Sequence, residues 1–243
     1  MKTLPILVLF ALAAAAQNKP DLSGVWQINL PAFLQGGIAP PANAAPAPPR
    51  RAARTGRGPA EPPYQPWAAA KVQERRDNQL KDDPDSRCLD PGVPRIVNMP
   101  MPMQIIQTPQ QVAVLYEAFH TFRVIPTDGR PHMDPLKLPP GGLFLGDSIG
   151  HWEGDTLVVD VTNFNDVTWL DNAGGIHSDQ LHVTERYRRP DHDTLLYEAT
   201  MEDPKVFTKP YTVNWTLKLR PDERLLEYEC LENNQDPPRL VGK

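Results

Sequence analysis

The stretch GDSIGHWEGDTLVVDVTNF, residues 146–164, has the sequence pattern of a β-hairpin. Two runs of alternating apolar and polar residues flank the turn Glu153-Gly154-Asp155, where Gly154 suits a positive φ angle. The apolar residues of the second run, on one face of the expected strand, are Leu157, Val159 and Val161. The stretch therefore predicts an antiparallel sheet with one buried face and one solvated face.

Similar runs continue outward from this hairpin in both directions. The expected strands are 17–30, 101–107, 111–126, 147–152, 156–164, 181–188, 194–202, 211–219 and 224–231. We take 111–126 as one long strand that bends near Ala118. The pattern predicts a mainly β fold, an antiparallel up-and-down barrel whose body spans residues 101–243.

Short and long connections alternate along these strands. In an up-and-down barrel, alternate connections lie at the same end. The long connections 126–146, 165–180 and 202–210 should therefore gather at one end, with the tight turns at the other. Long loops without secondary structure of their own are often functional. We therefore expect any site to lie at the long-loop end.

The N-terminus indicates export. Residues 1–16 combine Lys2, an apolar run and a series of small residues, which is typical of a secretory signal peptide. The run is too short to span a bilayer, and no other stretch is apolar enough, so we expect no membrane span and a periplasmic or secreted protein. The net charge of −5 argues against a nucleic-acid partner.

Residues 31–66 differ in composition from the rest of the chain. Ten of these 36 residues are proline and nine are alanine, so the segment should not form a core and should be flexible. It could act as a passive linker, or its arginines could contact a protein partner. Residues 67–100 follow as a helix and an irregular approach to the barrel, with Pro66 suited to the first helical turn.

Two cysteines are present, Cys88 and Cys230. In an oxidising compartment they are expected to form a disulfide bond. The alternative is a pair of free thiols.

The first strand carries a resemblance to known barrels. Its Gly24-Val25-Trp26 resembles the Gly-x-Trp signature that opens the first strand of lipocalins and related calycin barrels. The resemblance implies a cup that holds a small apolar molecule, although the Pro/Ala-rich insert and the lack of a C-terminal helix depart from lipocalins. The stretches GHWEGDTLVVDVTNF, HSDQLHVTERYRRPD and EDPKVFTKP resemble a family of exported bacterial proteins without an established activity, over residues 84–235.

Two residues expected to face the barrel interior are ionisable, His120 and Glu185. A buried carboxyl needs a partner or a raised pKa, so the two could act as a general acid–base pair. The alternative is a structural salt bridge from Glu185 to Arg123 or Arg186.

The loop 165–180 combines an aromatic residue, an acid and an imidazole around Gly174-Gly175, which is typical of a lid. Together with inward-facing aromatic residues, it completes our set of candidate ligand-binding residues: Tyr116, Asn163, Asn165, Trp169, His177, Asp179, His182, Tyr197 and Trp215. The spacing of the two histidines and Asp179 matches no standard metal motif, so we expect no metal and no cofactor.

Three functions are compatible with this sequence. The first is an exported barrel that binds a small, largely apolar molecule at its long-loop end. The second is a cofactor-independent isomerase, hydratase or lyase that uses the pair His120 and Glu185. The third is an envelope interaction module that engages a protein partner through residues 31–66.

Overall fold

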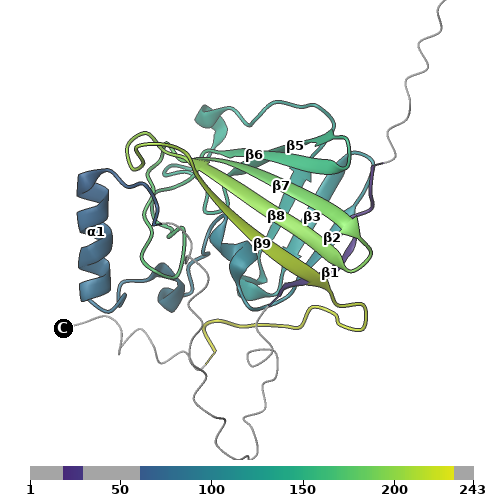
Figure 1. Cartoon of the computed structure of the whole chain (residues 1–243), viewed down its shortest axis with the longest axis horizontal. Coiled ribbons are helices and arrows are strands. Elements are labelled where there is room, and N and C mark those ends of the chain that lie inside the picture. Colours follow the sequence, from purple (N-terminus) through teal and green to yellow (C-terminus); the bar gives the residue numbers. More distant parts are fainter. Residues whose placement is uncertain (1–18, 30–60, 233–243) are drawn as a thin grey trace, which may run out of the picture.

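The computed structural model describes residues 19–29 and 61–232, and these residues form one barrel with an adjoining helix (Figure 1). The expected signal peptide and most of the Pro/Ala-rich segment lie outside the described residues. The described strands are β1 (Gly24–Ile28), β2 (Met103–Gln107), β3 (Gln111–Tyr116), β4 (Phe122–Pro126), β5 (Asp147–Glu153), β6 (Thr156–Thr162), β7 (His182–Asp191), β8 (Thr194–Glu202) and β9 (Tyr211–Leu219). The α-helix is α1 (Pro66–Asp77), which begins at the expected proline.

All nine described strands belong to one sheet, in the order β4-β3-β2-β1-β9-β8-β7-β6-β5, and every hydrogen-bonded pair is antiparallel. The sheet curls until β4 lies beside β5, which gives a nearly closed barrel (Figure 1). Gly150 of β5 allows this approach, because a Cβ atom there would lie 2.9 Å from Cγ2 of Ile125. The expectation of a mainly antiparallel β-barrel with one N-terminal helix is confirmed.

One expected strand is wrong in its length. Residues 111–126 form two strands, β3 and β4, separated by the short 3-10 helix η3 (Ala118–His120). Phe119 and His120 adopt φ angles of 62° and 49°, so the chain reverses here instead of bending. A second expected strand, 224–231, is absent. At the end of β9, where it would have begun to pair, residues 217–219 pair with β1 instead.

Splitting that strand changes the path of one connection. The strand registers make β4 and β5 run in the same direction, so residues 127–146 cross from one end of the barrel to the other. The turns 108–110, 154–155 and 192–193 lie together at what we call the turn end. The long connections 163–181 and 203–210 lie at the opposite end, the loop end, as expected.

Apolar side chains from the inner faces of the strands form the core. Fully buried members include Trp26, Ile105, Ile125, Leu157, Leu195 and Leu217. Val93, Ile96 and Val97 add to the same core from the irregular segment before β2. Helix α1 stands beside the loop end and buries only Ala68 and Val72 (Figure 1).

Two contacts attach the N-terminal part to the barrel. Cys88 and Cys230 form the expected disulfide, which links the end of η1 (Pro84–Arg87) to the C-terminal segment. Residues 61–65, expected to be part of a flexible segment, are instead docked: Tyr64 stacks on Phe207 at 5.4 Å, and the Gln65 N–H donates to the Val206 carbonyl. No helix among the described residues is both long and apolar enough to cross a membrane.

Candidate functional site

A polar network built around Glu185 occupies the barrel interior. The Glu185 side chain has no exposed surface, and it receives hydrogen bonds from Arg123 at 3.1 and 2.5 Å. The hydroxyls of Tyr187 and Tyr197 donate to the same carboxylate at 3.0 and 2.9 Å. Arg123 also donates to the Ser148 hydroxyl at 3.0 Å. The carboxylate is therefore fully paired, by the salt bridge that we considered as the alternative to acid–base chemistry.

The electrostatics of this network favour a fixed charge pair. Burial opposes the charge on Arg123, but the adjacent Glu185 carboxylate keeps the arginine pKa above its ordinary value. Burial and then the Glu185 charge raise the pKa of both Tyr187 and Tyr197, so these phenols stay protonated and act as donors. Breaking one partner of such a buried pair leaves an uncompensated charge, at a typical cost of about 3–5 kcal/mol.

His120 does not belong to this network. It lies in the turn between β3 and β4, is exposed, and its Nε2 accepts a hydrogen bond from the Tyr228 backbone N–H at 2.6 Å. The expectation of an inward-facing His120 was wrong because it assumed strand alternation through a segment that reverses direction. The structure does not bring His120 and Glu185 together.

Loop 163–181 lies at the loop end of the barrel, and two of the expected site residues in this loop are buried. The Trp169 ring is 2% exposed and lies under two guanidinium groups, at 4.6 Å from Arg75 and 5.9 Å from Arg95. His177 is also buried: its Nδ1 is 3.0 Å from the Ser178 carbonyl and its Nε2 is 2.7 Å from the Thr168 hydroxyl. Burial lowers the pKa of His177, which favours the neutral imidazole. Trp169 and His177 are therefore part of the buried interior.

The other candidates from this region lie apart from one another. Asp179 is exposed and pairs with Lys205 at 2.7 Å. His182 contacts Asp160 on the outer face at 2.7 Å. Asn163 and Asn165 shape the turn after β6: Asn163 has a φ angle of 60°, and the Asn165 side chain accepts from the Val167 N–H.

Three of the expected residues lie in the barrel interior or beside it: Tyr116, Tyr197 and Trp215. The Tyr116 hydroxyl is buried, and this burial raises the pKa of the residue to about 12. The Trp215 ring stacks on Tyr197 at 5.3 Å with an angle of 2° between the planes. Because Tyr197 is held by Glu185, the network fixes the orientation of Trp215.

Trp215 lines a pocket of about 760 Å³ in the side of the barrel, near the loop end. Its lining is Glu61, Pro62, Pro63, Tyr64, Pro94, Asn98, Leu170, Asp171, Met201, Lys209 and residues 210–215. We call this the side pocket. Most of its walls are apolar or aromatic, and a few polar groups face it.

The side pocket lies along the part of β9 that has no described partner strand on its β1 side. The two strands pair only from Trp26 with Leu219 to Ile28 with Leu217, and the Asn29 N–H makes one further bond, to the Thr216 carbonyl. Tyr211, Val213 and Trp215 fall on the inward face of β9, like Leu217. From Asn214 toward the start of β9, no described residue pairs with this edge of the strand, and the side pocket lies there.

Several polar groups line the side pocket. Burial and the nearby Asp171 carboxylate raise the pKa of both Tyr64 and Tyr211, so both hydroxyls remain protonated. Asn98 and Lys209 contribute further donors. The pocket can thus orient a ligand by hydrogen bonds and hold it by apolar contact.

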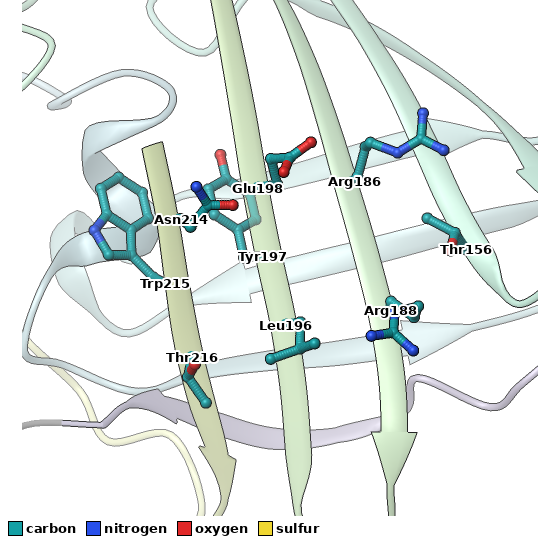
Figure 2. Close-up of a pocket in the computed structure, with 9 residues that line it drawn as sticks. All are labelled: Thr156, Arg186, Arg188, Leu196, Tyr197, Glu198, Asn214, Trp215 and Thr216. Carbon is teal, nitrogen blue, oxygen red and sulfur yellow. The ribbon is translucent and has the colours of Figure 1, made fainter. Parts of the chain in front are cut away.

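Two smaller depressions accompany the side pocket. One, of about 370 Å³, lies between β4 and β5 and reaches Arg123 and Ser148. The other, of about 310 Å³, lies on β6–β9, where Arg186 and Glu198 stand in one row and Arg188 and Leu196 in the next (Figure 2). The second depression is open and lined by charged side chains that are well solvated.

Sequence reasoning missed most of the side pocket. It placed Val213 and Trp215 on an inward face, but it gave no reason to associate them with Tyr64, Pro94 or Asp171. The available signal was Pro31, because a residue without a backbone N–H is a place where pairing of the first strand can be expected to stop.

No family model matches this chain, and neither a curated protein nor a solved structure matches it. The fold and the site therefore define only a class: a nearly closed antiparallel β-barrel with a fixed interior and a pocket in its side.

Proposed function

We propose that this chain is an exported, calycin-like β-barrel that binds a small, largely apolar molecule in the side pocket. The observation that carries the proposal is the pocket itself. Its volume of about 760 Å³ lies within the range of about 300–1,000 Å³ that is usual for small-molecule sites. Its combination of apolar walls with a few polar groups is typical of such sites.

The proposed relation to calycins is supported by the first strand. Gly24-Val25-Trp26 opens β1, and Trp26 is fully buried with its indole N–H donating to the Leu22 carbonyl at 2.9 Å. Export is supported by the signal-like pattern of residues 1–16 and by the disulfide between Cys88 and Cys230.

The other two functions have less support. An enzyme based on His120 and Glu185 lacks a geometric basis, because the carboxylate is paired with Arg123 and the imidazole lies outside. The interaction module rests on residues 31–66, most of which lie outside the described residues.

Binding of the neutral fluorescent probe N-phenyl-1-naphthylamine tests the proposal. The wild-type chain should bind the probe, and Trp215→Leu should weaken binding at least tenfold, or about 1.4 kcal/mol, since it removes the rigid wall. The matched control is Trp67→Leu, a substitution of an exposed tryptophan on α1 outside the pocket. Absence of probe binding, or equal loss in both variants, would contradict the proposal.

A further inference from the structure

One wall of the side pocket is an unpaired strand edge. In β9, the backbone groups of Thr216 and Arg220 point toward β1, as shown by the bonds from Asn29 N–H to Thr216 and from Arg220 N–H to Val25. Because backbone direction alternates along a strand, Thr212 and Asn214 point the same way. The opposite set, 211, 213 and 215, points toward β8.

Within residues 19–29 and 61–232, the backbone groups of Thr212 and Asn214 have no hydrogen-bond partner on that flank. Pairing of β1 with β9 stops at Ile28, apart from the bond of Asn29, and no backbone bond joins Thr212 or Asn214 to any described residue other than those of β8. Both residues are exposed, and both line the side pocket. Two N–H donors and two carbonyl acceptors therefore stand at the spacing of a β-ladder.

We propose that the ligand of the side pocket is an extended, uncharged peptide segment that adds to β9 as an antiparallel strand. This inference rests on the proposed function and names its ligand class. Strand addition supplies affinity through main-chain hydrogen bonds, and pockets for alternate side chains supply specificity. The unpaired edge of β9 provides the main-chain hydrogen-bonding groups, and the side pocket provides the space for the alternate side chains.

The register fixes which peptide groups face the barrel. Residues opposite Thr212 and Asn214 exchange hydrogen bonds with β9, and their side chains point outward, as those of Thr212 and Asn214 do. The intervening residues point inward, toward Val213 and Trp215, and face Pro94 across the pocket. Apolar side chains belong at these inward positions, and their own N–H groups point away from β9.

A methylation scan of one peptide tests this directly. The probe is the pentapeptide acetyl-Thr-Val-Thr-Phe-Thr-amide with a fluorescent label, measured by anisotropy against the full chain. N-methylation at the central threonine removes a donor to β9 and should weaken binding at least tenfold. N-methylation at the phenylalanine, whose N–H faces away, should leave the affinity within twofold.

A variant of the protein tests the same bond from the other side. Asn214→Pro removes the N–H that faces the vacant flank and no bond to β8, so it should weaken peptide binding at least tenfold. The control is Thr216→Ala, a substitution on the same face of β9 but outside the side pocket, which should bind as the wild type does. If the proline variant is misfolded by circular dichroism, the methylated peptides still decide, because they leave the protein unchanged.

The outcomes separate the two proposals. Peptide binding that depends on the central threonine N–H supports strand addition. Equal binding of both methylated peptides, or binding of N-phenyl-1-naphthylamine without any binding of the peptide, overturns strand addition and leaves the apolar pocket standing. If neither the peptide nor the naphthylamine probe binds, both proposals are wrong.

Discussion

At the scale of single residues, one arginine forms salt bridges with two carboxylates. Arg95 contacts Asp83 at 2.7 Å and Asp85 at 2.8 Å, and all three side chains are largely buried. The Asp85 Oδ1 atom has no hydrogen-bond partner in the described part of the chain. Burial outweighs the attraction of the shared Arg95 and raises the pKa of Asp85 to about 7.

Replacement of Asp85 should change how the free energy of unfolding depends on pH. Since the folded-state pKa is raised, the stabilising contribution of protonated Asp85 is complete below about pH 4 and is lost as pH rises through 7. Asp85→Asn cannot ionise, so its stability relative to wild type should rise between pH 5 and pH 8 by about 1–3 kcal/mol. Urea unfolding at both pH values measures the change.

Asp77→Asn is the matched control, because Asp77 lies exposed at the end of α1. It should show no comparable difference between the two pH values. A wild-type protein that gains stability relative to Asp85→Asn on going to pH 8 would contradict the assignment.

At the scale of elements, the C-terminal segment is held by contacts outside the sheet. The Leu226 N–H donates to Glu117, the Tyr228 N–H donates to His120, and Cys230 bonds to Cys88. None of these contacts belongs to a ladder between strands. The segment therefore depends on the disulfide more than the strands of the barrel do.

Removal of the disulfide should release this segment selectively. The double variant Cys88→Ser, Cys230→Ser should lose about 2–4 kcal/mol of stability, because the bond closes a loop of 142 residues in the unfolded chain. Amide hydrogen exchange should accelerate in residues 224–231 and remain slow in β6, β7 and β8. Reduction of the wild type should reproduce the pattern, and unchanged exchange in 224–231 would contradict it.

At the scale of the whole molecule, the barrel closes by side-chain packing where β4 meets β5. No backbone hydrogen bonds among the described residues join these two strands, which form the two ends of the strand order, but the side chain of Arg123 on β4 donates to Ser148 on β5. A Cβ atom on Gly150 would meet Ile125 at 2.9 Å, Thr127 at 3.2 Å and Leu157 at 3.3 Å. The absence of a side chain at Gly150 thus sets the distance between the two strands.

Gly150→Val should force the two strands apart. Overpacking of this kind typically costs about 1–3 kcal/mol, and the NMR shifts of β4 should move with it. His151→Val is the matched control, since His151 is the next residue of β5 and its side chain is exposed. Equal melting temperatures for the two variants would mean that β4 and β5 are not in contact at Gly150.

A structural feature can be predicted from this sequence when the residues that determine it lie close together in the chain. The hairpin of β5 and β6 is predictable because alternation and turn glycine both lie within it. The turn at Ala118–His120 is not, because apolar alternation runs through it without glycine or proline and the left-handed angles fall on Phe119 and His120. Tyr197 and Trp215 are predictable as inward residues, but the side pocket depends on where β1 stops pairing with β9, which is a property of two distant strands.

The pairing of β1 with β9 also determines when the sheet can be completed. Trp26 and Leu219 face each other across 193 positions of sequence (219 − 26 = 193). Closing so long a loop carries an entropic cost that local turns avoid, and distant pairings slow folding. During synthesis, β1 to β4 emerge from the ribosome first, and the edge of β1 stays unpaired until β9 has been made. The folded barrel is consequently a late product of translation, and the ribosome must have made at least residue 219 before the two halves of the sheet can join.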